Sequence, residues 1–209
     1  MKETASISGY YFSSTESSHA HAYLLPTVER LIQSCNLRDQ KVFDLGCGNG
    51  SIARWLGDCG FDVSGVDPSE SGIEHAKRIC PEQNLQLGSC YDPLSEQFGQ
   101  FPLVISLEVV EHVYAPRDYA RCLLSLMEPN GWAIVSTPYH GYLKNLLLAL
   151  TNHLDGHFTA LWDHGHIKFW SIKTLSRLFE ETGLVVSRVE RVGRIPALAK
   201  SMVFLIRKT

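Results

Sequence analysis

The stretch KVFDLGCGNG, residues 41 to 50, decides the fold class of this chain. KVFDLG (41–46) predicts a short buried strand, and the glycines that close the stretch predict a tight turn into a helix. Each glycine lets the backbone turn sharply or approach a ligand without a Cβ atom in the way. Free N–H groups at the start of the next helix can hold an anionic group such as a carboxylate. The alternative is an ordinary tight turn.

Strands and helices alternate along the chain after this turn. Such alternation predicts βαβ units, and therefore an α/β fold in which a parallel sheet carries helices on both faces. Residues 22–35, 51–60, 70–80, 117–127 and 171–183 are the predicted helices. The predicted strands are 41–46, 61–67, 85–88, 102–107, 132–137, 184–192 and 201–208.

The composition favours one domain that acts on a small molecule. With 209 residues, 44% of them hydrophobic, and no linker or repeat, residues 1–209 are expected to form a single domain. The net charge of −3 disfavours extended nucleic-acid binding, which needs a basic surface. Six widely spaced cysteines and a polar N-terminus without a secretory pattern predict a cytoplasmic location. Peripheral membrane contact and the oligomeric state stay open.

Residues 138–167 interrupt the alternation. They contain the amphipathic segment YLKNLLLALTNHL (142–154) and five of the nine histidines. We expect an insertion after the fifth strand that forms a lid over the strand ends or lines an apolar pocket. The alternative is that its apolar side chains simply cover the sheet.

An acidic residue ends the second predicted strand. Asp67 stands 21 residues after Gly46, a spacing at which a carboxylate can accept hydrogen bonds from ribose hydroxyls. This spacing suits a cofactor that contains adenosine. The alternative is a helix N-cap, because Asp67-Pro68-Ser69 is also typical of a helix start, and neighbouring residues could fill both roles.

Four motifs in order, DLGCGNG, GVDPSE, GSCYDP and SLEVVEHV, resemble class I S-adenosylmethionine-dependent methyltransferases. The resemblance covers roughly residues 40 to 137. It implies a Rossmann-like fold with a seven-stranded, mostly parallel sheet, and S-adenosyl-L-methionine as the cofactor. A nicotinamide-binding enzyme would have G-x-G-x-x-G, whereas this chain has glycines at 46, 48 and 50.

The resemblance also implies which residues bind the cofactor. It places one group around the methionine portion, one at the ribose and one at the adenine ring, and a backbone contact at the end of the fourth strand. Ser89 stands where many relatives have an aspartate, which weakens the expected contact with the adenine amine. The residues around the methionine portion are Asp44, Gly46, Cys47, Gly48 and Gly50; those at the ribose are Asp67, Pro68 and Ser69; those at the adenine ring are Ser89, Cys90 and Tyr91; and the backbone contact is made by Leu107.

LEVVEHV (107–113) brings Glu108, Glu111 and His112 to the mouth of the pocket, because ligands of open parallel sheets bind beyond the carboxyl ends of the strands. On a helix, positions i, i+3 and i+4 share an arc of about 100°, so the three side chains are expected to converge. Two carboxylates and an imidazole suit a divalent cation. The alternative is a packed helical turn in which the glutamates interact with the helix dipole.

A fourth candidate ligand lies in HGHIKFWS, where His166 precedes Phe169 and Trp170. The EVVEH and H-x-x-F-W motifs together resemble small-RNA 2′-O-methyltransferases, in which two glutamates and two histidines hold a magnesium-type ion. E-x-x-E-H alone also resembles ubiquinone-biosynthesis O-methyltransferases. The resemblance implies a set for Mg²⁺ or another divalent metal, namely Glu108, Glu111, His112 and His166.

The predicted function is O-methylation of a small hydrophobic or aromatic hydroxyl acceptor, assisted by a divalent metal. His140 follows the fifth strand in TPYH and could act as a general base, and His166 and His112 are the other catalytic candidates. One alternative is metal-free O- or N-methylation with a histidine base. A nucleic-acid 2′-O-methyltransferase and a non-catalytic methyltransferase-like subunit are two more.

Overall fold

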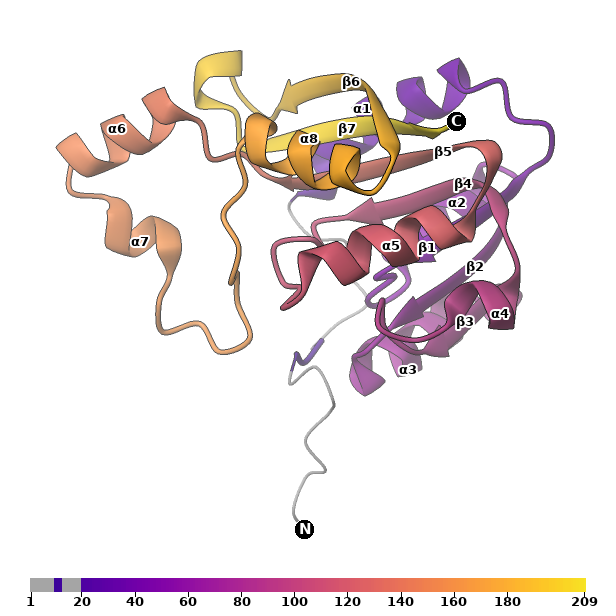
Figure 1. The fold of residues 1–209 in the computed structure, drawn as a ribbon. Coiled ribbons are helices and arrows are strands. Elements are labelled where there is room, and N and C mark those ends of the chain that lie inside the picture. The colour runs from indigo at the N-terminus through magenta and orange to yellow at the C-terminus, as the bar shows by residue number, and fades with distance from the viewer. Residues whose placement is uncertain (1–9, 13–19) are drawn as a thin grey trace, which may run out of the picture.

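The structure, a computed structural model, describes residues 10–12 and 20–209. Its centre is a seven-stranded sheet in the order β3-β2-β1-β4-β5-β7-β6 (Figure 1). Neighbouring strands from β3 to β5 are parallel, and β7 runs antiparallel to both β5 and β6. The strands are β1 (Lys41–Leu45), β2 (Asp62–Asp67), β3 (Asn84–Leu87), β4 (Phe101–Leu107), β5 (Met127–Pro138), β6 (Leu184–Val192) and β7 (Ser201–Lys208).

Helices cover both faces of this sheet, so its central strands are apolar on both sides. All seven residues of β4 are buried. Alternate residues belong to different cores: Leu103 and Ile105 face one side and Val104 faces the other. α1 (His21–Ser34), α2 (Ser51–Asp58) and α3 (Glu70–Ile79) pack in the first core, and α4 (Leu94–Phe98), α5 (Pro116–Leu126) and α8 (Ile172–Glu181) pack in the second.

The strand order places the candidate site. The chain moves outward from β1 to β3, then returns to add β4 on the other side of β1. Ligands bind at such a point of reversal, outside the carboxyl ends of the strands. The loop after β1 and the segment after β4 flank this point. They contain the glycine motif and LEVVEHV, respectively.

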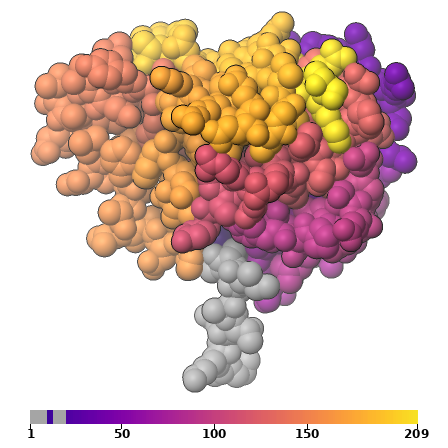
Figure 2. Space-filling view, in the orientation of Figure 1, coloured from indigo at the N-terminus to yellow at the C-terminus, as the bar shows by residue number. Residues whose placement is uncertain are grey.

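The predicted insertion is present and contains α6 (Tyr142–Leu150) and α7 (Leu154–Phe158). It extends beyond the end of the sheet at which β4 and β5 finish (Figure 1), and it forms a separate lobe on the molecular surface (Figure 2). α6 packs against α7 and the short helix η1 (Pro196–Leu198), and none of its nine residues, all of them described, is buried. The apolar residues of α6 therefore do not cover the sheet, whereas Trp170, just after the insertion, packs against the second core.

The other predicted elements are confirmed, with small differences at their ends. The largest concerns β5, which begins at Met127 rather than at 132 because Met127 pairs with Phe101 of β4. Among the described residues, no helix is long and apolar enough to cross a lipid bilayer.

Candidate functional site

The glycine loop after β1 packs directly on the segment after β4. Gly46 has φ +88°, in the left-handed region that favours glycine, and a Cβ atom there would lie 2.4 Å from Cγ2 of Val109. Its N–H and that of Cys47 both donate to the Val66 carbonyl, at 2.9 and 3.0 Å. The motif therefore joins three parts of the site: the loop itself, the end of β2 and the start of LEVVEHV.

Asp44 at the end of β1 is a buried carboxyl group with an unused acceptor. Its Oδ2 atom has no hydrogen-bond partner among the described residues. Burial raises the pKa of Asp44 to about 8, and the charge of Asp67 adds to this. A cationic ligand group would fit here, because it would supply the missing partner and stabilise the ionised form.

Asp67 holds the loop rather than capping the next helix. Its Oδ2 accepts from the Gly48 N–H at 2.9 Å, and its Oδ1 accepts from the Ser69 N–H at 2.8 Å. The N-cap of α3 is Ser69, whose Oγ accepts from the Gly72 N–H, so the expected helix start is present and its cap is the neighbouring residue rather than Asp67. Burial raises the pKa of Asp67 to about 6, and the two N–H donors oppose this effect.

The predicted cofactor residues all lie at or just after the carboxyl ends of four neighbouring strands. In the part that was expected to border an adenine ring, the Ser89 N–H donates to Oδ2 of Asp92 at 2.7 Å. Ser89 Oγ also donates to this oxygen, at 3.3 Å, so the Asp92 carboxylate lies beside Ser89, although the motif analysis did not select Asp92. The residues are Asp44, Gly46, Cys47, Gly48 and Gly50 at the end of β1 and in the loop after it; Asp67, Pro68 and Ser69 at the end of β2 and after it; Ser89, Cys90 and Tyr91 after β3; and Leu107 at the end of β4.

A short N-terminal segment also lies on the loop, and sequence analysis missed it. The Phe12 N–H donates to Ser71 Oγ at 3.0 Å, and Ser69 Oγ donates to the Tyr10 carbonyl at 2.8 Å. The Phe12 ring also lies where a Cβ atom of Gly48 would point, at 2.9 Å. No motif marks Tyr10 and Phe12, because their contacts depend on a chain separation of about sixty residues.

The segment after β4 is not helical, which corrects the expected convergence of Glu108, Glu111 and His112. It consists of turns, and Glu108 has φ +57°, a left-handed conformation uncommon outside glycine. This conformation turns the Glu108 carboxylate toward β5 and β7, where it accepts hydrogen bonds from Ser136 Oγ at 2.8 Å and Ser201 Oγ at 3.3 Å. Glu108 therefore lies outside the group of potential metal ligands that the structure assembles.

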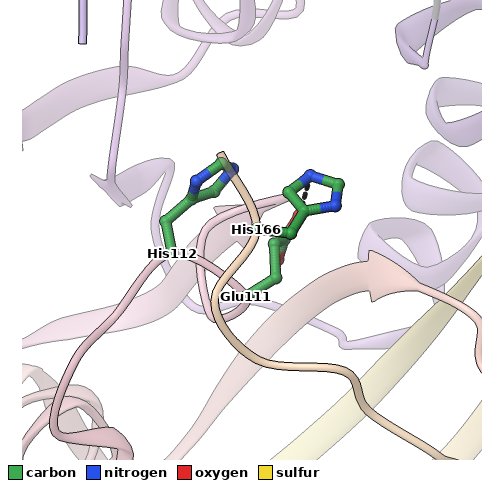
Figure 3. Close-up of side chains that lie close together, drawn as sticks. All are labelled: Glu111, His112 and His166. Atoms are coloured by element: carbon green, nitrogen blue, oxygen red, sulfur yellow. Dashed lines mark ion pairs between the residues drawn. The ribbon is translucent and has the colours of Figure 1, made fainter. Parts of the chain in front are cut away.

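That group contains Glu111, His112 and His166, whose potential ligand atoms all lie within 4.8 Å of one another (Figure 3). Backbone pairing brings them together, because the N–H groups of residues 167 and 168 both donate to the Glu111 carbonyl at 2.9 Å. Three of the four residues predicted as metal ligands are thus neighbours, although they come from two segments far apart in sequence.

Two members of the group have a ligand atom for which the described part of the chain shows no hydrogen-bond partner. Glu111 accepts from Thr137 Oγ1 through Oε2 at 3.0 Å, while its buried Oε1 has no hydrogen-bond partner in the described part of the chain. His112 Nδ1 faces the carbonyls of residues 164 and 165 at 3.3 and 3.2 Å. Because carbonyls only accept, Nδ1 carries the proton and Nε2 stays free.

Burial keeps both imidazoles of the group neutral. It lowers the pKa of His166 to about 4, with a further contribution from His112, and it also lowers the pKa of His112. The contact of 3.9 Å between His166 Nε2 and Glu111 Oε1, dashed in Figure 3, therefore does not join two full charges. Burial, and then the charge of Glu108, raises the pKa of Glu111. Neutral imidazoles are the form that binds metals.

His140 belongs to a neighbouring aromatic cluster. It is buried, and its backbone N–H donates to the backbone carbonyl of Trp170 at 3.0 Å. Its ring lies 5.3 Å from that of His157, and it stacks on Phe158 and meets Phe169 edge-on. Burial, with contributions from Lys144 and His157, lowers its pKa to about 4. His140 is thus a neutral imidazole beside an apolar wall, a short distance from the ligand group.

Comparison with known proteins relates the chain to one family. A family model described as a methyltransferase domain matches residues 17–189. The ubiquinone biosynthesis O-methyltransferase of Caulobacter sp. strain K31 is 38% identical over 115 residues, which cover 52% of this chain and 44% of the relative. The protein of that name from Thiobacillus denitrificans is 30% identical over 152 residues, covering 71% and 66%. The chain thus spans about half to two thirds of the length of these relatives.

Solved structures share the fold. The magnesium protoporphyrin IX methyltransferase of Synechocystis PCC 6803 with bound SAH superposes with a TM-score of 0.64 at 19% identity, covering 89% of this chain and 82% of that one. A putative sarcosine dimethylglycine methyltransferase from Galdieria sulphuraria gives a TM-score of 0.68 at 15% identity, covering 97% and 91%. At these identities the likeness concerns the fold alone.

Proposed function

This chain belongs to the methyltransferase domain family, as a class I S-adenosylmethionine-dependent methyltransferase, and from that premise we propose that it methylates a hydroxyl of a small aromatic acceptor with help from a divalent metal. The resemblance in the four sequence motifs is thereby confirmed. One observation carries the proposal. The group of Glu111, His112 and His166 includes two residues that come shortly after Val109 in the chain, and Val109 packs against Gly46 of the glycine loop. An acceptor bound at this group would therefore lie beside the cofactor.

The residues after β1 and β2 fit the cofactor. When bound, S-adenosylmethionine supplies an electrophilic methyl group on a sulfonium centre. The buried, unpaired Oδ2 of Asp44 would face the ammonium group of the methionine portion. Asp67 would accept hydrogen bonds from the ribose hydroxyls, and its present bond from the Gly48 N–H holds its carboxylate beside the loop.

The ligand group fits a divalent cation such as Mg²⁺ or Mn²⁺. Glu111 Oε1 and the two neutral imidazoles would hold it, with the Thr137 hydroxyl and two backbone carbonyls fixing their orientation. When bound, such an ion lowers the pKa of a hydroxyl group that it touches. His166 and His112 would then orient the acceptor, which leaves His140 as the candidate that receives the hydroxyl proton.

The surroundings of the group favour an aromatic acceptor over a nucleic acid. Trp162 lies at ring distances of 6.0 Å from His112 and 5.2 Å from His166, and Phe158 and Phe169 line the adjoining cluster. Flat apolar walls of this kind suit an aromatic ring. The net charge of −3 offers no basic surface for a phosphate backbone. A cytoplasmic location stays a prediction.

Methyl transfer to catechol, with and without a chelator, tests the proposal. Radiolabel from S-adenosylmethionine should appear in the methylated product, and chelation should reduce the rate at least about tenfold. Added Mn²⁺ should restore it. Undiminished turnover in the presence of the chelator would contradict metal assistance, and the absence of any methylated product would contradict hydroxyl methylation of this acceptor class.

The second candidate function is metal-free methylation with His140 as the base. It is favoured by one observation, namely that Nδ1 of this buried neutral imidazole has no hydrogen-bond partner among the described residues. His140→Gln separates the two candidates. It should abolish a metal-free reaction but only slow a reaction whose hydroxyl is already acidified by a metal.

A further inference from the structure

Residues 10–12, the N-terminal strap, lie across the start of α3 and are held there by hydrogen bonds. The Tyr10 carbonyl accepts from Ser69 Oγ at 2.8 Å, and the Phe12 N–H donates to Ser71 Oγ at 3.0 Å. The two serine hydroxyls are themselves 3.1 Å apart. Two residues of the strap are thus bound to neighbouring positions of one helix, although about sixty residues separate the partners in sequence.

The Phe12 ring fills space that two glycines leave open. A Cβ atom at Gly48 would lie 2.9 Å from Cζ of this ring, and a Cβ atom at Gly72 would lie 3.0 Å from its Cδ2. The ring therefore contacts both the glycine loop and α3. Asp67 connects the same two elements, because it accepts from the N–H groups of Gly48 and Ser69. The strap thus packs beside the carboxylate at which the ribose of the cofactor is expected.

The Tyr10 ring extends from the strap to the ligand group and the insertion. It lies 4.8 Å from the Phe12 ring, and it meets the rings of His112 and Trp162 edge-on at 6.2 and 6.3 Å. Aromatic pairs attract each other at such separations. His112 belongs to the ligand group and Trp162 to the insertion, so Tyr10 joins three segments that are far apart in sequence. Figure 1 shows the strap in indigo, near the loop through which the insertion returns to the sheet.

This arrangement connects cofactor binding to the acceptor side of the site. A cofactor in contact with the strap would restrain it, and a restrained strap holds the Tyr10 ring against His112 and Trp162. Docking of the insertion then costs less conformational entropy when the cofactor is already bound. The coupling also acts in reverse, because linkage between two binding events is reciprocal.

We propose that the strap is a further cofactor-binding element, and that Tyr10 is a positioning residue that docks the insertion on the site when the cofactor is bound. Phe12 anchors the strap on the glycine loop, and Tyr10 passes the restraint to Trp162. The wall of the acceptor side is therefore complete only in the cofactor-bound protein. The inference goes beyond the proposed function and needs neither a metal nor a particular acceptor.

Calorimetry and stopped-flow measurements with S-adenosylhomocysteine test the strap. Phe12→Ala should bind it at least about fivefold more weakly, because the variant loses a large apolar contact that holds the strap in place. Most of the loss should appear as faster dissociation, since a segment that lies across a ligand must move before the ligand leaves. Phe12→Leu, which keeps part of the apolar contact, should fall between Phe12→Ala and the wild type.

The matched control is Tyr11→Ala, which removes the aromatic ring next to Phe12 at a residue that is 76% exposed. This variant should bind S-adenosylhomocysteine as the wild type does. Equal affinities and dissociation rates for the wild type, Phe12→Ala and Tyr11→Ala would overturn the strap. An equal loss in both variants would overturn it as well, because the contacts of Phe12 with the loop would then have no part in binding.

Acrylamide quenching of Trp162 fluorescence tests the role of Tyr10. The signal of Trp162, which is 44% exposed, is the difference between a protein and its Trp162→Phe variant. Saturating S-adenosylhomocysteine should reduce the quenching in the wild type, in Tyr11→Ala and in Tyr10→Phe, which keeps the ring. This protection should be lost in Tyr10→Ala.

Two results would overturn docking through Tyr10. One is quenching of Trp162 in the wild type that does not respond to S-adenosylhomocysteine. The other is the same degree of protection in Tyr10→Ala as in the wild type, because Tyr10 would then serve only the structure of the free protein. Both measurements use S-adenosylhomocysteine alone, so their outcome is independent of whether catechol is methylated.

Discussion

Asp44 connects protonation to cofactor binding through one buried carboxyl group. With its pKa raised to about 8 by burial, this group carries a proton at pH 7 in the free protein. An ammonium group placed against Oδ2 favours the ionised form, so binding should release the proton. Calorimetry of S-adenosylhomocysteine binding at pH 7, in buffers with different ionisation enthalpies, should show release of roughly one proton. Asp44→Asn should bind without release, and a wild type that releases none would remove Asp44 from the cofactor site.

The same group makes the stability of the free protein depend on pH. Its folded pKa of about 8 lies above the unfolded value of 3.8, so its contribution is fully present below pH 4 and is lost as pH rises toward 8. Thermal unfolding of the free protein should therefore show a Tm that declines between pH 5 and 8. The decline should be smaller in Asp44→Asn. An identical pH profile for the two proteins would mean that burial does not raise this pKa.

Glu111 is the residue on which metal binding depends most, because it supplies the only carboxylate of the described ligand group and its buried Oε1 has no hydrogen-bond partner among the described residues. Glu111→Gln should weaken Mn²⁺ binding, followed by paramagnetic resonance, at least about tenfold. Glu96→Gln, at an exposed position on α4, is the control and should bind as the wild type does. Equal Mn²⁺ affinity in both variants would show that the ion lies elsewhere.

The site was predictable from sequence where motifs lie at strand ends and unpredictable where a single dihedral angle decides. Glu111, His112 and His166 were found by motif, and the structure brings them together. Glu108 was assigned to the same set because the segment after β4 was assumed to be a helix. Its φ of +57° cannot be predicted from the amino-acid sequence. The start of α3 was likewise found in Asp67-Pro68-Ser69, but the sequence could not show which residue is the cap, because both Asp67 and Ser69 are good N-cap residues.

At the scale of elements, the turn between β1 and α2 depends on close packing as much as on backbone conformation. Gly46 and Gly183 have similar left-handed φ values of +88° and +84°, but only Gly46 has a neighbour within 4 Å of its virtual Cβ, namely Val109. Gly183→Ala should therefore cost about 1–2 kcal/mol in free energy of unfolding, from backbone strain alone.

Gly46→Ala should cost more than this and should also weaken S-adenosylhomocysteine binding, because Val109 and the loop must move apart. Urea unfolding and calorimetry measure the two effects. If Gly46→Ala and Gly183→Ala lose the same stability and both keep full cofactor affinity, the close contact between the loop and LEVVEHV has no functional role.

At the scale of elements, the insertion shows that a sequence pattern can identify an amphipathic segment without showing what it packs against. YLKNLLLALTNHL was recognised from its apolar spacing as an amphipathic segment, and most of it forms helix α6. That spacing could not show what the apolar side chains contact. Tyr142 and Leu150 remain 83% and 73% exposed, because α6 packs on η1 and α7 instead of on the sheet.

At the scale of the whole molecule, the fold followed from the alternation of strands and helices. Parallel strands covered on both faces need continuous apolar runs, which are easy to recognise, and β4 is buried along its full length. The site lies where the strand order reverses between β1 and β4, so the fold fixes its location before any side chain is considered. The contacts of Tyr10 and Phe12 with the loop could not be predicted, because they depend on where a distant segment returns.

The most direct test of the account is a crystal structure of the protein with S-adenosylhomocysteine and soaked Mn²⁺, with anomalous scattering used to locate the ion. We predict an anomalous peak bound by Glu111 Oε1 and the ring nitrogens of His112 and His166, with the cofactor held between Asp44 and Asp67. A peak at another site, or a fully occupied cofactor beside a ligand group without an ion at saturating Mn²⁺, would contradict metal-assisted methylation at this site.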